Sequence, residues 1–362
     1  MHFAKLSIAG SLLLTSCAIK TDHAQTDTAL SDIVKSLRTP GEIPALVLSE
    51  FSCTSRSLAW EGTAKLGSET EIKETSRFAI GSNAKSFLAT AAIRIGADLD
   101  APLSETWPEV ASRAPEKSSI TLRQLFSHSS GLPAFDTGKA LNAVPSFTGS
   151  DATATARAAV WFLEQPLAAE PGTQTVYSNA GYVVAGAILE RLFGRPFHAL
   201  IEDEVFKPLG LEGAFGEPRL LEDKVFGHYV SEGAITPYTE TDPPIPPFLE
   251  AAGNVVLSMP DYVTYLQAHL CGLQGESSDF LDKDKAVQLH VSQLENGAGL
   301  GWGKTELGGV ETSFHIGGTG DFTAFAALAP DRDQGVAALM NVGGAPAGGV
   351  QAWVIETMSA DP

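Results

Sequence analysis

The chain has 362 residues, and its 43 acidic side chains against 24 basic ones give a formal net charge of −19. A surface this acidic repels phosphate, which argues against a sequence-independent nucleic-acid-binding protein. Apolar residues make up 44% of the sequence and charged residues 19%, a balance typical of a folded chain rather than a disordered one. The length exceeds what one simple core usually fills, so we expect two lobes.

The N-terminal sequence is typical of an export signal. A weakly basic start precedes an apolar run over 6–14, which is too short to span a bilayer because that takes about 20 residues. The sequence Leu-Thr-Ser-Cys ending at Cys17 resembles the bacterial lipobox, in which the cysteine is lipidated. We expect a signal peptide at 1–16, a tether at 17–28, and a periplasmic protein anchored to the outer membrane through Cys17. The alternative is an ordinary secretory peptide with a chance cysteine near its cleavage site.

Two further cysteines, Cys53 and Cys271, lie far apart in the sequence. An oxidising periplasm would permit a disulfide between them, but no sequence feature fixes their geometry, so we expect two buried thiols. The chain contains no CxxC, and its eight histidines show no HxH or HxxxH spacing. The sequence therefore predicts no metal site and no cofactor.

The predicted elements place strands near both ends of the chain and helices between them. Neighbouring strands are expected at 43–50 and 57–65, which are rich in Val, Leu, Ala and Trp. Helices are expected at 82–95, 121–126, 152–163, 180–193 and 198–206. Later elements are strands at 313–316, 323–329 and 336–341 and a last helix at 350–358. Five prolines within 236–247 predict a wrapping loop there.

This order predicts an α+β fold with an antiparallel sheet built from both chain ends. Strands without strict alternation with helices favour antiparallel pairing. We expect the sheet lobe, with its flanking helices, to comprise 29–95 and 250–362. A mainly helical lobe is inserted between these two parts, over 96–249.

Ser82 and Lys85 form an S-x-x-K pattern where a helix is expected to begin. Three residues along a helix is nearly one turn, so both side chains lie on the same face. A serine hydroxyl is a poor nucleophile until a base removes its proton, and an amine whose pKa is lowered by burial can do so. The helix N-terminus also offers N–H groups to a developing oxyanion. The alternative is an N-cap serine followed by a surface lysine.

Two later motifs also carry polar groups suited to catalysis. A phenol such as Tyr177 ionises more easily near a lysine and can transfer a proton, and Asn179 can hold a substrate amide or the lysine. The glycines after His315 let the backbone approach a ligand closely and expose N–H groups. The alternative for Tyr177 and Asn179 is that they are ordinary hydrogen-bonding loop residues. The alternative for the glycines is a tight turn at a strand end, with His315 a polar residue whose hydrogen bonds are made.

Three motifs occur in the order and at the intervals of a known family. They are Ser82-x-x-Lys85, Tyr177-x-Asn179 and His315-x-Gly317. In this order they resemble the serine hydrolases that include class C β-lactamases, DD-carboxypeptidases and β-lactamase-like esterases. The flanking stretches TLRQLFSHSSGLP at 121–133 and PGTQTVYSNAGY at 171–182 are also similar to family segments. The likeness extends over roughly residues 40–360, which makes it more specific than any one motif.

The resemblance implies a β-lactamase/transpeptidase-like fold whose two lobes form one catalytic domain. Ser82 would be acylated, and Lys85 and Tyr177 would share the general-base and general-acid work, with the choice of base left open. The N–H groups of Ser82 and Gly318 would form the oxyanion hole. The substrate-binding positions implied are Asn179, His315, Gly317 and Gly318. The substrate would be an ester, an amide, a D-amino-acid peptide or a β-lactam.

The sequence departs from the family pattern at its third motif. His315 stands where the β-lactamases of this group have lysine, and Ile316 stands where many relatives carry a hydroxyl that helps bind a substrate carboxylate. These changes favour an esterase or a DD-peptidase-like enzyme over an efficient β-lactamase. The competing function is a non-catalytic or slow-turnover cell-wall ligand-binding protein on the same fold. The oligomeric state is not predicted.

Overall fold

The computed structural model describes residues 25–26, 28–39, 41–136, 138–147, 151–276, 278–295 and 297–360. The predicted signal peptide, Cys17 and the tether up to residue 24 lie outside the described residues. The end of the predicted tether is structured: strand β1 (Gln25–Thr26) pairs with the sheet, and helix α1 (Thr28–Leu37) follows. Every helix in the described part of the chain is too short or too polar to cross a membrane.

The main sheet has seven strands drawn from both ends of the chain, and this confirms the predicted fold class. Its spatial order is β1, β3 (Arg56–Gly62), β2 (Ala45–Phe51), β12 (Gln334–Met340), β11 (Thr323–Ala329), β10 (Val310–Gly318) and β9 (Gly303–Leu307). All pairings are antiparallel except the short one between β1 and β3. At the centre of the sheet, β2 pairs with β12 from Leu46 opposite Met340 to Phe51 opposite Gly335.

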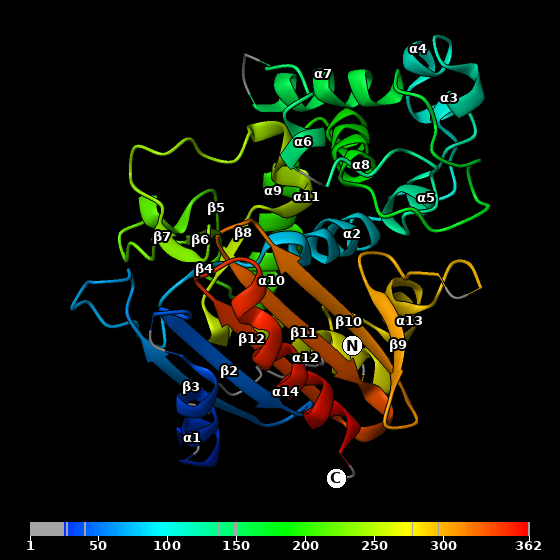
Figure 1. Cartoon of the computed structure of the whole chain (residues 1–362). Coiled ribbons are helices and arrows are strands. Elements are labelled where there is room, and N and C mark those ends of the chain that lie inside the picture. The colour runs from blue at the N-terminus through cyan, green and yellow to red at the C-terminus, as the bar shows by residue number, and fades with distance from the viewer. Residues whose placement is uncertain are drawn as a thin grey trace, which may run out of the picture.

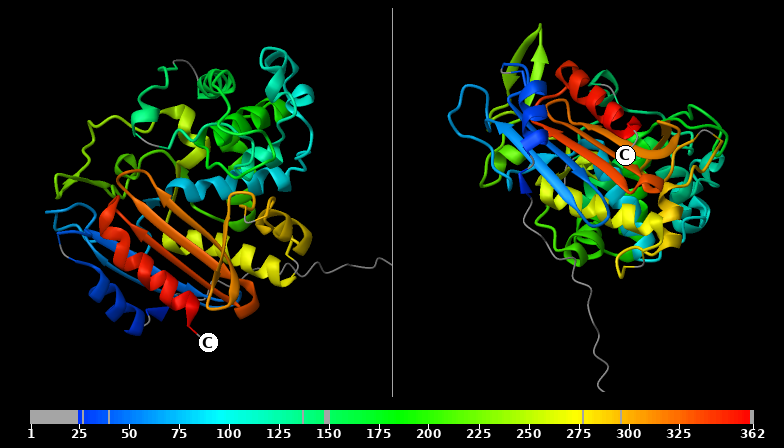
Figure 2. Two further views of the ribbon diagram at one scale, coloured as in Figure 1. Left: turned by 45° about the vertical axis from the view of Figure 1, so that its right-hand side comes forward. Right: turned by 90° about the horizontal axis from the view of Figure 1, so that it is seen from below.

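Helices cover both faces of this sheet, so its central strands are buried on both sides. One face packs against α1 and α14 (Gly348–Ser359), and the other packs against α12 (Met259–Gln274), as Figure 2 shows. In β12, Val336 and Ala338 belong to the core under α1 and α14, whereas Ala337 and Leu339 belong to the larger core on the other side. This alternation follows the two-residue period of a strand.

The helical lobe lies above the sheet lobe in Figure 1, in cyan and green. At its centre is α8 (Asn179–Phe193), most of whose residues are buried, packed against α7 (Asp151–Leu163) and α5 (Leu122–Phe126). Short helices of this part of the chain are α3 (Leu103–Thr106), α4 (Pro108–Ala111), α6 (Gly138–Leu141), α9 (Phe197–Ile201), the π-helical turn η3 (Glu202–Phe206) and α10 (Lys207–Leu209). The 3₁₀ turns η2 (Pro115–Lys117), η4 (Pro218–Leu220) and η5 (Pro247–Leu249) also belong to it. A small sheet of β4 (Phe78–Ala79), β8 (Val255–Leu257) and β5 (Ala214–Phe215) lies where the chain crosses between the lobes. A hairpin of β6 (His228–Ser231) and β7 (Ala234–Pro237) precedes the proline-rich loop.

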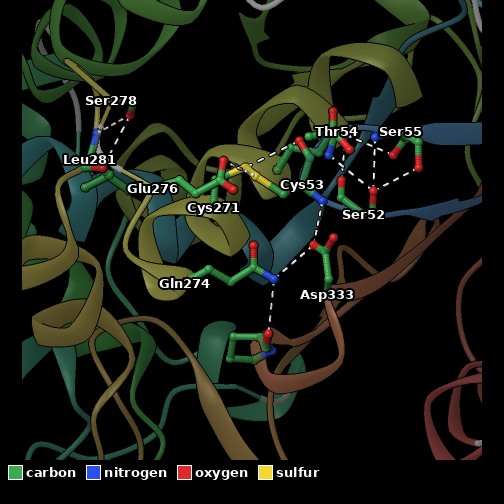
Figure 3. The surroundings of a disulfide bond; sticks show 12 residues. Ser52, Cys53, Thr54, Ser55, Cys271, Gln274, Glu276, Ser278, Leu281 and Asp333 are labelled. Atoms are coloured by element: carbon green, nitrogen blue, oxygen red, sulfur yellow. Dashed lines mark hydrogen bonds between the residues drawn. A yellow bond between two sulfur atoms is a disulfide. The ribbon is translucent and has the colours of Figure 1, made fainter. Parts of the chain in front are cut away.

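The expectation of two buried thiols is wrong, because Cys53 and Cys271 form a disulfide with their Cα atoms 5.1 Å apart. Cys53 lies in the turn between β2 and β3, and Cys271 lies on α12, which packs against β2. The backbone N–H of Cys53 and the side-chain amide of Gln274 both donate to one carboxylate oxygen of Asp333 (Figure 3). Tertiary packing thus brings together two cysteines that are 218 residues apart.

Candidate active site

Ser82 lies in η1 (Gly81–Asn83), a 3₁₀ turn between β4 and the buried helix α2 (Ala84–Arg94). The turn is fixed by Asn83, whose side-chain amide donates to the carbonyl oxygens of Ile80 and Ala324. Gly81 has a positive φ of 52°, and a Cβ there would lie 2.6 Å from the backbone nitrogen of Gly318. Only glycine allows this contact between η1 and β10.

Lys85 is completely buried, which contradicts the alternative of a surface lysine. Its Nζ donates to the Oγ of Ser82 at 3.0 Å and to the carbonyl oxygen of Ala252 in α11 (Glu250–Gly253). Burial lowers the pKa of Lys85, and the nearby Tyr177 acts in the opposite direction. A lowered pKa makes the neutral amine accessible, and a neutral amine can accept the serine proton.

Tyr177 approaches the same hydroxyl from the helical lobe. Its hydroxyl lies 2.6 Å from the Oγ of Ser82, and its ring centroid lies 5.1 Å from the Nζ of Lys85. The residue is 37% exposed, on the loop that precedes α8. Ser178 caps that helix by accepting the backbone N–H of Gly181. The hydroxyl of Ser82 is therefore held between a buried amine and a partly exposed phenol.

Strand β10 carries the third motif past η1, the turn that holds Ser82. A Cβ at Gly317 would lie 2.1 Å from the carbonyl oxygen of Ile80, so this position also requires glycine. His315 is buried, and burial with the nearby charge of Lys85 lowers its pKa to about 4. Its Nδ1 lies 2.7 Å from the carbonyl oxygen of Gly301. Because a carbonyl only accepts, Nδ1 carries the proton and the Nε2 of the neutral ring is a hydrogen-bond acceptor.

The structure therefore joins Ser82, Lys85 and Tyr177 by direct hydrogen bonds and places the glycines of the third motif against η1. Asn179 is the first residue of α8, and its side-chain amide donates to the carbonyl oxygen of Phe135 at 2.9 Å. Two groups were not identified from the sequence, the carbonyl of Ala252 and the side chain of His128. Their contacts join segments that are distant in the sequence, although His128 does lie within the family-like stretch at 121–133.

The chain is similar to several known proteins. A family model described as Beta-lactamase matches residues 51–356. The unguisins hydrolase ungD of Aspergillus violaceofuscus is 25% identical over 83% of this chain, and this chain spans 58% of that protein's length. Penicillin-binding protein 4 of Amycolatopsis lactamdurans is 25% identical, with 85% of this chain and 83% of the relative covered. The crystal structure of the D-amino acid amidase from Ochrobactrum anthropi SV3 has the same fold, with a TM-score of 0.69, 23% identity, and 87% and 90% of the two chains covered.

Proposed function

Because the chain belongs to the Beta-lactamase family, we propose that it is a serine hydrolase that forms an acyl-enzyme on Ser82. The observation that carries this proposal is the position of the Ser82 hydroxyl, 3.0 Å from the Nζ of Lys85 and 2.6 Å from the hydroxyl of Tyr177. Both neighbours are groups that can exchange a proton with it. An N-capping serine would need neither.

In the acylation step, the Oγ of Ser82 attacks the substrate carbonyl carbon while its proton passes to the amine of Lys85 or to an ionised Tyr177. The same pair then returns a proton to the leaving alcohol or amine as the carbonyl–heteroatom bond breaks. Water enters, gives up a proton to the pair, and releases the acid while Ser82 regains its hydrogen. Lys85 and Tyr177 both contact the same hydroxyl, so the step is assigned to the pair rather than to one residue.

The carbonyl oxygen becomes negative during both steps and needs N–H donors. We propose the backbone N–H groups of Ser82 and Gly318 for this role. The contact between Gly81 and Gly318 supports it, because it places these two backbone segments side by side at the start of a helical turn.

We infer that uncharged esters and small amides are better substrates than β-lactams. A β-lactam carboxylate needs cations or hydrogen-bond donors, but His315 with a pKa of about 4 is neutral at pH 7 and presents an acceptor. Ile316, 46% exposed beside it, donates nothing. Each lost bond costs about 1–3 kcal/mol, or roughly one to two orders of magnitude in specificity. The relatives named hydrolase and D-amino acid amidase are consistent with amide chemistry.

The decisive experiment combines covalent labelling with turnover. A fluorophosphonate probe should label wild-type protein at Ser82, as mass spectrometry of the labelled peptide would show, and should fail to label Ser82→Ala. Ser112→Ala, at an exposed serine of the helical lobe, is the matched control and should label like wild type. A panel of p-nitrophenyl acetate, a D-amino acid amide, a D-Ala-D-Ala peptide and nitrocefin then ranks the substrates.

The outcomes separate the enzyme from a ligand-binding protein on the same fold. Labelling of Ser82 without turnover of any substrate in the panel favours the binding protein. Higher kcat/KM for nitrocefin than for the ester contradicts the substrate inference and leaves the hydrolase intact. Ile316→Thr and His315→Lys should each raise nitrocefin turnover relative to ester turnover.

We also propose that the protein is exported and anchored through a lipidated Cys17. The disulfide between Cys53 and Cys271 supports an oxidising compartment, where such bonds persist. Cys17→Ser should release soluble or unprocessed protein from the membrane fraction. Unchanged fractionation, together with mass spectrometry that finds no acyl chain, would contradict the anchor.

A further inference from the structure

Tyr177 is partly exposed and lies on a loop, so its position must be fixed by contacts other than burial. Both of its neighbours in the sequence donate their backbone N–H groups to one residue, His128. The N–H of Val176 donates to the carbonyl oxygen of His128 at 2.7 Å, and the N–H of Ser178 donates to its ring Nδ1 at 3.0 Å. The loop is therefore tied to His128 on each side of the tyrosine.

The imidazole ring of His128 also contacts the phenol ring itself. The two ring centroids are 4.5 Å apart at an interplanar angle of 35°, and the buried Tyr182 packs against the same imidazole at 5.3 Å. His128 is buried and has a positive φ of 58°. Residues other than glycine seldom adopt this conformation, and it persists only where surrounding contacts impose it.

The protonation state of the ring follows from its partner. A backbone N–H only donates, so Nδ1 must be unprotonated and the proton lies on Nε2. Burial lowers the pKa of His128 well below its usual value, and the charges of Lys85 and His315 act in the same direction. The ring thus remains neutral at pH 7 and keeps its acceptor available to Ser178.

We propose that His128 is a positioning residue that holds the hydroxyl of Tyr177 beside the Oγ of Ser82. It acts through the backbone on both sides of Tyr177 and through ring contact, and it does not touch the reacting atoms. Its effect on turnover rests on the proposed function, whereas its effect on the loop does not. Misplacement of a catalytic group by about 1 Å can reduce turnover about 100-fold, so loss of this anchor should disturb the 2.6 Å contact with Ser82 and lower turnover by about that factor.

Three substitutions separate the acceptor from the bulk of the ring. His128→Asn places a carbonyl oxygen close to the position of Nδ1, and asparagine tolerates a positive φ. His128→Gln carries the same amide one bond further out. His128→Phe keeps a planar ring but leaves the N–H of Ser178 without its acceptor. If ring bulk alone matters, Phe should be the best replacement, and if the acceptor matters, Asn should be.

The experiment measures loop protection and turnover together on the full chain. Hydrogen exchange followed by mass spectrometry reports on peptides covering 173–181, and thermal unfolding shows which variants are folded. We expect His128→Phe to exchange faster in this loop and to lose about 100-fold in kcat with little change in KM. We expect His128→Asn to keep wild-type protection and most of kcat, with His128→Gln in between.

Unchanged exchange in His128→Phe, or Asn performing no better than Phe in both measurements, would overturn the proposal. If His128→Phe does not fold, the comparison between Asn and Gln still decides, because both carry an amide and differ in where it lies. If wild type neither labels at Ser82 nor turns over any substrate, the proposed function fails. The exchange data then still show whether His128 anchors the loop.

Discussion

The sheet lobe builds its side of the site by packing backbone against backbone, whereas the helical lobe holds its side with a few hydrogen bonds to one loop. Lys85 is fully buried on α2, and neither Gly81 in η1 nor Gly317 on β10 has room for a side chain where these two segments meet. Tyr177 is 37% exposed and depends on the polar contacts of its two neighbours. The hydroxyl of Ser82 is thus contacted by Lys85, which is held by close packing, and by Tyr177, which is held by hydrogen bonds of its neighbours to His128.

This difference matches the work proposed for each group. A lysine needs a dry surrounding for its pKa to fall, and only close packing supplies it. A group on the open side must leave room for substrate and water, so it cannot be buried in the same way. The two sides should therefore fail differently when they are altered.

The largest effect is expected from removing the two proton-transfer groups. Lys85→Met keeps the apolar stem without the charge and should lower kcat/KM for p-nitrophenyl acetate about 10³–10⁴-fold, and Tyr177→Phe about 10²–10³-fold. Because both act on one hydroxyl, the double variant should be little worse than Lys85→Met. A double variant whose loss equals the product of the single losses would show that the two sides act independently.

The disulfide belongs to the sheet side only, far from the loop of Tyr177. Replacing both cysteines (Cys53→Ser with Cys271→Ser) should lower the free energy of unfolding by about 2–5 kcal/mol, measured by urea titration. Turnover at 25 °C should be unchanged as long as the protein is folded. A parallel loss of kcat in the folded variant would mean that α12 transmits strain to the site.

A methyl group where β10 contacts η1 tests the side of the site that is held by close packing. Gly317→Ala would bring a Cβ to 2.1 Å from the carbonyl oxygen of Ile80, so we expect about 1–3 kcal/mol less stability and a fall in kcat of about 100-fold. Gly348→Ala, where a Cβ meets only open space, is the control. Wild-type kcat in Gly317→Ala would show that the two segments can move apart to accommodate a methyl group without loss of activity.

The last effect is confined to stability and concerns Asp321, in the turn between β10 and β11. Burial raises its pKa from 3.8 to about 6, and Glu217 adds to this while Thr319 and Arg219 oppose it. Between pH 3.8 and about 6, Asp321 is protonated in the folded chain but ionised in the unfolded chain. The free energy of unfolding therefore falls as pH rises through the folded pKa. Asp321→Asn has no proton to lose at this position. The free energy of unfolding of the variant relative to wild type should therefore be about 2–3 kcal/mol higher at pH 7.5 than at pH 4. Urea unfolding at both pH values measures it, and the exposed Asp331→Asn should show no such trend.

The sequence predicted those parts of the fold that have local signals. The composition of β2 and β3, the final strands, and α8 ending at Gly194 all correspond to observed elements. Helix α12 was not predicted, although its N-cap Ser258 and left-handed Gly275 are such signals. Strands β8 and β9 were not predicted either, because each is short and lacks a clear period.

Long-range contacts explain what the sequence could not show about the site. The S-x-x-K spacing predicts that Ser82 and Lys85 share a face, but the second partner of the Lys85 amine, the carbonyl of Ala252 on α11, lies 167 residues further along the chain. Likewise, the partnership of His128 with the Tyr177 loop spans 50 residues. Neither contact has a periodic pattern, so the motif could be recognised while its support could not.

The pairing of β2 with β12 determines when during protein synthesis the site can exist. Strand β2 is complete at residue 51, but its partner begins at residue 334. At a synthesis rate of about 5–20 residues per second, the interval is on the order of tens of seconds. During that time Ser82 and Lys85 have emerged, yet β10 and the centre of the sheet have not. A ribosome-bound chain therefore carries Ser82 and Lys85 without the strands that complete the site, and the full arrangement can form only as the last strands are added.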